Sequence, residues 1–179
     1  MLVVDARTGV AAAIERIRAL ERDVTGPSML AGVGAVLLEL GTEHEDALTR
    51  LLPTLPSSSR GHRLHVDSDH RFALYLVAEE PAAESPPHCH LTWSVTVCLR
   101  GEERHALYRR VGPAEERRAR KQREVVLVPG AILAMQADEI HATRVTSPVP
   151  TFHVQMYGLD LTEMPDFSLR TFVDSGEAP

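Results

Sequence analysis

The sequence has few cysteines, no excess of basic residues and no long uninterrupted hydrophobic run. Its two cysteines, Cys89 and Cys98, are too few for a disulfide framework, and no basic N-terminal segment leads into an apolar stretch of the secretory type. The longest apolar stretch, SMLAGVGAVLLEL, contains glycines and is too short to span a bilayer. These features predict a cytoplasmic protein that has no membrane partner.

The charge balance argues against a nucleic-acid partner. The chain has 179 residues, of which 19 are basic and 25 acidic, so its formal net charge is −6. A nucleic acid is held by basic surface, and the sequence offers no pair of helices with a basic face that would read DNA. A small molecule is therefore the expected partner. The length fits one domain with one sizeable core, and no feature of the sequence points to a particular oligomeric state.

Helical patterns are confined to the first third of the chain. In DARTGVAAAIERIRALERDV, apolar residues recur at helical spacing with charges on the opposite face, which predicts an amphipathic helix. These apolar positions are Val10, Ile14, Ile17 and Leu20. A second apolar segment and EHEDALTRLLPTL extend the helical pattern until Pro53 and Pro56 end it. We therefore expect residues 1–58 to form a helical segment that packs on the rest of the chain.

From about residue 62 the pattern changes to short β-type runs bounded by proline, glycine or charged turns. The runs are RFALYLVAE, LTWSVTVCLRG, ALYRRV, EVVLVPGAILAM, HATRVTS and PTFHVQMYGLDL. Such runs predict an antiparallel sandwich or barrel over residues 59–165, followed by a C-terminal tail, 166–179, within one structural domain. The charged stretch GPAEERRARKQRE is predicted to be a solvated loop or hairpin tip.

Two histidines, His88 and His90, stand one residue apart before an alternating apolar run. Successive side chains of a strand point to opposite faces, so both imidazoles share one face, about 6.6 Å apart along the chain, while Cys89 points away. Two imidazoles placed in this way can converge on one cation. Histidines at this spacing are also common on solvent-facing strands, so the pair alone leaves both readings open.

The surroundings of the pair favour a metal site. HCHLTWSVTVCLRG resembles the first motif of the cupin superfamily, with Ser94 at the position of the usual glutamate and Gly101 at the turn. VPGAILAMQADEIHATRV resembles the second cupin motif, with a Pro-Gly turn and His141. The resemblance implies a mainly β fold, the cupin double-stranded β-helix barrel or jelly roll, preceded by N-terminal α-helices. It also implies that His88, His90 and His141 bind a metal ion without a carboxylate ligand.

Three neutral imidazoles leave the charge of a divalent ion uncompensated, so such a site favours an anionic ligand, for example a thiolate or a carboxylate. A three-histidine cupin with N-terminal helices resembles the thiol dioxygenases, that is, the cysteine dioxygenase family and its bacterial relatives. The resemblance covers roughly residues 10–165 and rests on HCHLTWSVTVCLRGEERHALYRR, EIHATRV and FHVQMYGLD. It implies an Fe(II) cofactor, although histidine-only ligation also suits Zn, Ni and Cu. It further implies dioxygen and a small thiol, such as cysteine or a mercaptoalkanoate, as the reactants that yield a sulfinate.

The family resemblance also implies a residue that binds the substrate carboxylate. Family members place an arginine on an early strand about two dozen residues before the histidine pair. Arg63 stands at nearly that distance, and Arg71 is the second choice. An arginine suits this role because its planar fork can hold a carboxylate by two hydrogen bonds.

The chain departs from the family around its last β-type run. Tyr157 and His153 are the candidate catalytic residues, as donors of a hydrogen bond to bound oxygen. The family's Ser-x-His-x-Tyr pattern is not intact in either register, because Thr151 and Gln155 occupy positions of the pattern. Val95 stands where some animal members have the cysteine that crosslinks to the tyrosine, so no crosslink is expected.

Two other functions stay open on the sequence alone. One is a metal-binding cupin with different chemistry, such as a dioxygenase that cleaves a ring or a carbon–carbon bond, or an isomerase. The other is a cupin that binds a small ligand without turnover. The remaining histidines receive no role from the sequence. They are His44, His62, His65, His70 and His105.

Overall fold

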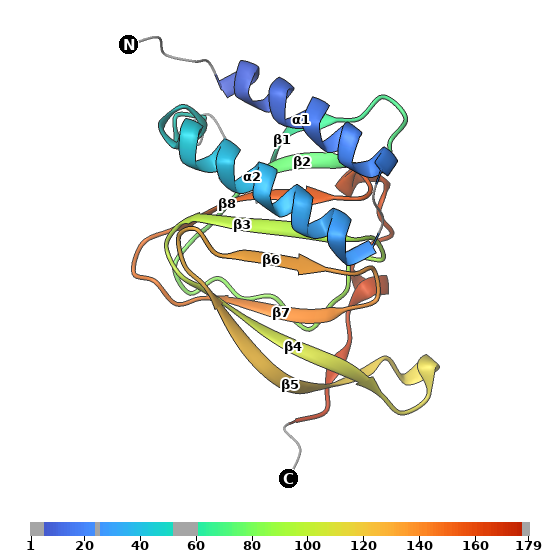
Figure 1. The fold of residues 1–179 in the computed structure, drawn as a ribbon. Coiled ribbons are helices and arrows are strands. Elements are labelled where there is room, and N and C mark those ends of the chain that lie inside the picture. Colours follow the sequence, from blue (N-terminus) through green and yellow to red (C-terminus); the bar gives the residue numbers. More distant parts are fainter. Residues whose placement is uncertain (1–5, 24–25, 52–60, 177–179) are drawn as a thin grey trace.

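Two helices lie on one side of a two-sheet β structure in the computed structural model of the protein (Figure 1). The structure describes residues 6–23, 26–51 and 61–176, so the predicted helix end at Pro53 and Pro56 lies outside the described residues. Helix α1 (Ala6–Asp23) matches the predicted amphipathic helix, and α2 (Gly26–Thr49) contains the second apolar segment. Neither described helix has both the length and the hydrophobicity needed to cross a bilayer.

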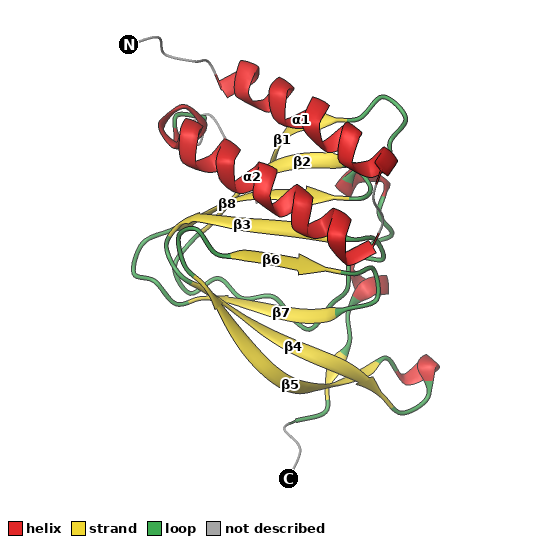
Figure 2. Ribbon diagram, in the orientation of Figure 1, coloured by secondary structure: helices red, strands yellow, loops and turns green. Residues whose placement is uncertain are grey.

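The strands form two sheets that curl around a common interior (Figure 2), and all strand pairs except that of β5 with β9 are antiparallel. One sheet has the order β1-β2-β8-β3-β6 and the other the order β7-β4-β5-β9. In chain order the strands are β1 (Gly61–Val66), β2 (Ala73–Glu79), β3 (Ser94–Arg100), β4 (Glu103–Val111), β5 (Arg118–Leu127), β6 (Ile132–Met135), β7 (Ile140–Val145), β8 (Thr151–Tyr157) and β9 (Val173–Asp174). The predicted fold, a double-stranded β-helix barrel preceded by helices, is confirmed.

The main hydrophobic core lies between the helices and the outer face of the five-stranded sheet. On β8, Phe152, Val154 and Met156 belong to this core and are buried. The alternate residues of β8 face the barrel interior, because side chains along a strand point to opposite faces. Polar side chains of β3 occupy the same inner face, opposite those of β8. The barrel therefore has an apolar exterior under the helices and a polar interior.

The sequence of α2 allows it to lie close to the sheet. This helix contacts β3, β6 and β8, while α1 packs on α2. At Gly41 a Cβ atom would lie 2.3 Å from Cδ2 of Leu99 on β3, so any other residue there would require the Leu99 side chain to move. In the same interface Leu37 is fully buried. The helices thus supply one side of the main hydrophobic core, which lies outside the polar interior of the barrel.

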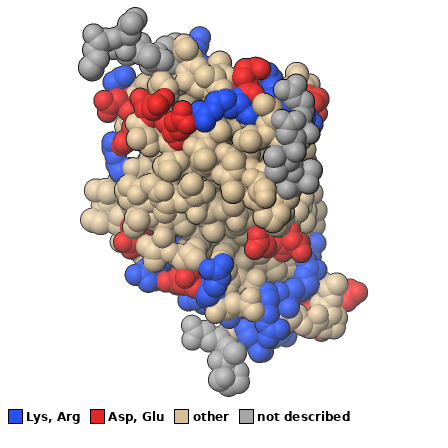
Figure 3. Space-filling model, viewed as in Figure 1, with Lys and Arg blue, Asp and Glu red and all other residues tan. Residues whose placement is uncertain are grey.

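The charged stretch predicted to be a loop or hairpin tip is partly strand. Residues 112–117 form the tip between β4 and β5, as predicted, but Arg118–Leu127 pair with β4 along their whole length. The prediction failed there because most charged side chains of β5 remain in solvent, and Figure 3 shows basic side chains gathered around this hairpin.

The predicted C-terminal tail also contains regular structure. A short 3-10 helix (Phe167–Arg170) precedes β9, which pairs in parallel with the start of β5. Backbone hydrogen bonds also join Cys89 to Arg170 and Phe172 to Pro87, so this segment is attached to the stretch that contains His88 and His90.

Candidate metal centre

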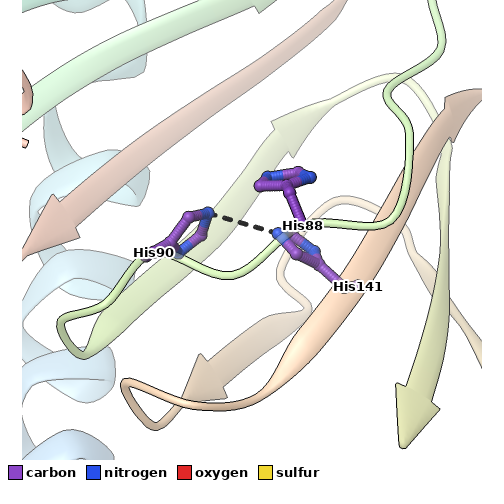
Figure 4. A group of neighbouring side chains, drawn as sticks. All are labelled: His88, His90 and His141. Carbon is purple, nitrogen blue, oxygen red and sulfur yellow. Dashed lines mark hydrogen bonds between the residues drawn. The ribbon is translucent and has the colours of Figure 1, made fainter. Parts of the chain in front are cut away.

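The three predicted histidines come together in the barrel interior (Figure 4). His141 lies on β7, whereas His88 and His90 lie in an irregular extended stretch before β3 rather than in a regular strand. His88 and His141 face each other through two backbone hydrogen bonds of 2.8 and 2.9 Å. A left-handed residue, Leu91 with φ 58°, ends the extended stretch directly after His90. His88 and His90 therefore share a face, as predicted, but they do not lie on a regular strand.

The geometry of the three imidazoles fits one metal ion. One nitrogen of each ring lies within 4.8 Å of those of the other two, and the three residues are only 3 to 7% exposed. The Nε2 atoms of His90 and His141 are 3.2 Å apart. Two nitrogens bound to one ion at about 2.1 Å are about 3.0 to 3.4 Å apart, depending on the angle at the ion. The three side chains could therefore hold a metal, with the rest of its coordination sphere open.

Each candidate ligand uses its other ring nitrogen to contact a neighbouring group. His88 Nδ1 donates to the Pro86 carbonyl at 2.9 Å, and His90 Nδ1 lies 2.9 Å from the Ser94 hydroxyl. His141 Nδ1 lies 3.1 Å from Nδ1 of His105. Partners of this kind fix the orientation and tautomer of metal-binding histidines. Ser94, at the position of the usual cupin glutamate, therefore supports a histidine.

Two residues of the site, Glu103 and His105, received no role from the sequence. Both are buried and lie on the inner face of β4, where His105 Nε2 contacts Glu103 Oε2 at 3.2 Å. The alternation of Glu103 and His105 after the glycine turn at Gly101 was the available signal. It was not decisive, because alternating polar residues equally describe the solvent face of a strand.

Burial keeps the candidate ligands neutral. It lowers the pKa of His88 to about 4 and that of His90 to about 3, and it lowers the pKa of His141 well below its usual value. Burial also lowers the pKa of His153, a further histidine of the interior, to about 4. Neutral imidazoles have the lone pair that a metal needs, so the site is ready to bind a cation at neutral pH.

The same four histidines predict that the metal-free protein loses stability in weak acid. Their folded pKa values lie below the usual 6.5, so the unfolded chain binds more protons between about pH 6.5 and pH 4. The free energy of unfolding should be constant above this window and fall inside it by several kcal/mol. Urea unfolding with a chelator at pH 7.5, 6, 5 and 4.5 measures this. Equal urea midpoints at pH 7.5 and pH 5 would contradict the prediction.

A small cavity adjoins the three histidines. Its volume is about 130 Å³, and its lining includes the candidate ligands, Glu103, His105, Tyr157 and His153. The Tyr157 ring meets the His90 ring edge to face, with centroids 5.0 Å apart. Burial raises the pKa of Tyr157, so its hydroxyl keeps its proton. The structure therefore brings both predicted catalytic residues to the candidate metal centre.

The structure does not bring the predicted carboxylate-binding arginine to this cavity. Arg63, on the edge strand β1, pairs with the buried Asp160 at 2.8 Å, and about half of its side chain is exposed. Arg71 contacts Asp67 and Asp69 instead. No lysine or arginine is among the described residues that line the cavity. β1 is the edge strand of its sheet, and the neighbouring β2 presents Val77 and Glu79 to the cavity.

Comparisons with known proteins concern the fold. No family model matches the sequence, and no curated protein matches it. A cupin superfamily protein from Desulfitobacterium hafniense is similar in structure, with a TM-score of 0.44 and 15% identity over 62% of this chain and 88% of that chain. A protein with a double-stranded β-helix domain from Klebsiella pneumoniae has a TM-score of 0.45 and 15% identity, over 62% and 87%. KdgF from Halomonas sp. has a TM-score of 0.44 and 13% identity, over 57% and 80%. These similarities are too distant to indicate a function, so the evidence for function lies in the side chains of this site.

Proposed function

We propose that the protein binds Fe(II) through His88, His90 and His141 and oxidises a small thiol with dioxygen to its sulfinate. The observation that carries the proposal is a cluster of three buried, neutral histidines in which no carboxylate of the described residues takes part. Such a cluster leaves the positive charge of the ion available to a thiolate. The reaction consumes one thiol and one dioxygen. Both oxygen atoms end on sulfur, and the sulfinic acid that forms ionises.

The residues around the cavity have separate tasks in this proposal. Bound iron would make the thiol more acidic and supply the redox chemistry that dioxygen requires. The buried Nδ1 of His153 has no hydrogen-bond partner among the described residues, so it is available to take the thiol proton. Tyr157, held as a neutral phenol beside His90, is available to donate a hydrogen bond to an oxygen atom of the reacting species. The cavity volume of about 130 Å³ suits a thiol of a few heavy atoms.

Oxygen uptake by the iron-loaded protein tests the proposal. Protein purified anaerobically should bind about one equivalent of Fe(II) and consume oxygen when cysteine, 3-mercaptopropionate or cysteamine is added. His88→Ala should lose both properties, since it removes one candidate ligand. Iron binding without uptake on any of the three thiols would overturn the proposed reaction and point to another cupin activity. Failure to bind iron would overturn the proposed metal centre.

Arg63 gives a second test of the substrate site. We expect Arg63→Ala to change the KM for cysteine or 3-mercaptopropionate by less than about twofold, because Arg63 pairs with Asp160 and does not line the cavity. The steady-state rate of oxygen uptake over a range of thiol concentrations measures this. A KM raised by 10-fold or more would restore the role that the sequence suggested for Arg63.

A further inference from the structure

One buried carboxylate lies between two histidines of the interior. Glu103 Oε2 is 3.2 Å from His105 Nε2 and 3.1 Å from His153 Nε2. All three residues are buried, with exposed fractions of 2 to 4%. His105 in turn contacts the candidate ligand His141, and their rings are stacked with centroids 5.3 Å apart. A continuous chain of groups therefore runs from the cavity histidine His153 through Glu103 to the candidate metal centre.

The positions of the protons on this chain follow from what each group can donate. Burial alone would raise the pKa of Glu103, but hydrogen bonds from the side chains of His105 and Thr143 help to keep it below its usual value. The carboxylate is therefore ionised and can only accept, so His105 has its proton on Nε2. The other ring nitrogen of His105, Nδ1, faces His141 Nδ1 and can accept its proton. The lone pair of His141 is thereby placed on Nε2, the atom that faces His90.

The other neighbour of the carboxylate is oriented in the same way. His153 Nε2 lies near Glu103 Oε2, although not aligned as a full hydrogen bond. A proton on Nε2 is favoured there, because a lone pair facing an ionised oxygen would be repelled. The lone pair of His153 is then on Nδ1, which is buried and has no partner in the described part of the chain. His153 also lines the cavity.

We propose that Glu103 is a positioning residue that sets the tautomers of two histidines at once, His141 through His105 and His153 directly. The inference rests on the proposed metal centre and adds to it the residue that keeps the lone pair of His141 on Nε2, where it is available to a metal ion. It also gives one anchor to both the metal ligand and the histidine that would take the substrate proton. Removing this anchor should therefore weaken metal binding even when no substrate is present.

Co(II) binding to the full chain tests the effect of Glu103 and His105 on the metal centre without any need for turnover. The visible spectrum of Co(II) reports binding, and titration gives the Kd. We expect His105→Phe, which keeps a ring against His141 but removes its acceptor, to raise the Kd by about 10- to 100-fold, and Glu103→Gln by about 10-fold. Glu102→Gln removes the neighbouring carboxylate, which accepts from Thr146, and should stay within about twofold of the unaltered chain.

Histidine tautomers measured by long-range ¹H–¹⁵N NMR test the shared anchor in the metal-free protein. The unaltered chain should show His141 protonated on Nδ1, and His105 and His153 on Nε2. In Glu103→Gln the neutral amide can donate as well as accept, so His141 and His153 should both become tautomer mixtures. His105→Phe should change His141 alone.

The possible results separate this inference from the proposed function. If the unaltered chain shows His141 protonated on Nε2, the inference is wrong. This measurement needs no variant. Co(II) affinity in His105→Phe equal to that of the unaltered chain would also overturn it, while the metal centre would stand. If the unaltered chain does not bind Co(II) or Fe(II), both the metal centre and the inference fail. Circular dichroism establishes that each variant is folded before its Kd is compared.

Discussion

His90→Ala is expected to abolish metal binding by the protein. His90 is one of the three candidate ligands: its Nε2 lies 3.2 Å from that of His141, and its ring centroid is 5.3 Å from that of His88. Its removal leaves two imidazoles and a buried space where the third donor stood. The loss in metal affinity should exceed the 10- to 100-fold typical of an outer partner, so more than about 100-fold.

Metal analysis after anaerobic loading with Fe(II), together with a Co(II) titration, measures this loss. His62→Ala is the matched control, because His62 lies on β1 and does not line the cavity. The control should keep the metal content of the unaltered chain. Equal metal content in His90→Ala and the unaltered chain would mean that the three histidines do not form the metal centre, and the proposed function would lose its basis.

Leu37→Ala is expected to destabilise the whole protein by about 2 to 5 kcal/mol. Leu37 lies on α2, is fully buried, and belongs to the core shared by the helices and the outer face of the five-stranded sheet. A cavity left there removes contacts from both layers, and the interior of the barrel cannot compensate because it is polar. If helices and barrel fold as one unit, the change should lower the midpoint of a single unfolding transition.

Leu38→Ala is the matched control for this prediction. Leu38 is the next residue of α2 and is only half-buried, so the same substitution should cost clearly less. Urea unfolding followed by circular dichroism and by Trp93 fluorescence compares the two variants. Similar losses for both, or a transition in which the helical signal is lost before the fluorescence changes, would contradict the assignment of the main core to this interface.

Local sequence patterns predicted the parts of the fold in which apolar residues are buried and charged residues lie in loops or on exposed helix faces. Apolar residues at helical spacing predicted α1. Gly101 predicted a turn, because glycine readily adopts the positive φ of 80° that is found there. The histidine pair and His141 were found through their resemblance to known motifs. The strand part of the 112–124 stretch was missed, because its long charged side chains are typical of loops as well as of an exposed strand.

The residues around the metal centre were harder to predict, because their roles depend on partners far away in the chain. Arg63 has the expected place in the sequence, but Asp160, 97 residues later, pairs with it outside the cavity. His105 looks like any polar residue of a strand until β7 brings His141 against it. Neither contact can be read from spacing, since each depends on which strands lie near one another in a sheet: β4 pairs with β7, and Asp160 follows β8 in the sheet that contains β1.

The two faces of β8 have a consequence for how this protein can change. Phe152, Val154 and Met156 fill the core under the helices, whereas His153 and Tyr157 line the cavity from the same seven residues. Substitutions of the cavity-lining residues of β8 can therefore change the chemistry of the site, while the alternate residues of the strand keep the core packed. A library restricted to positions 153, 155 and 157 should retain a large share of folded members and makes this strand the natural starting point for altering reactivity.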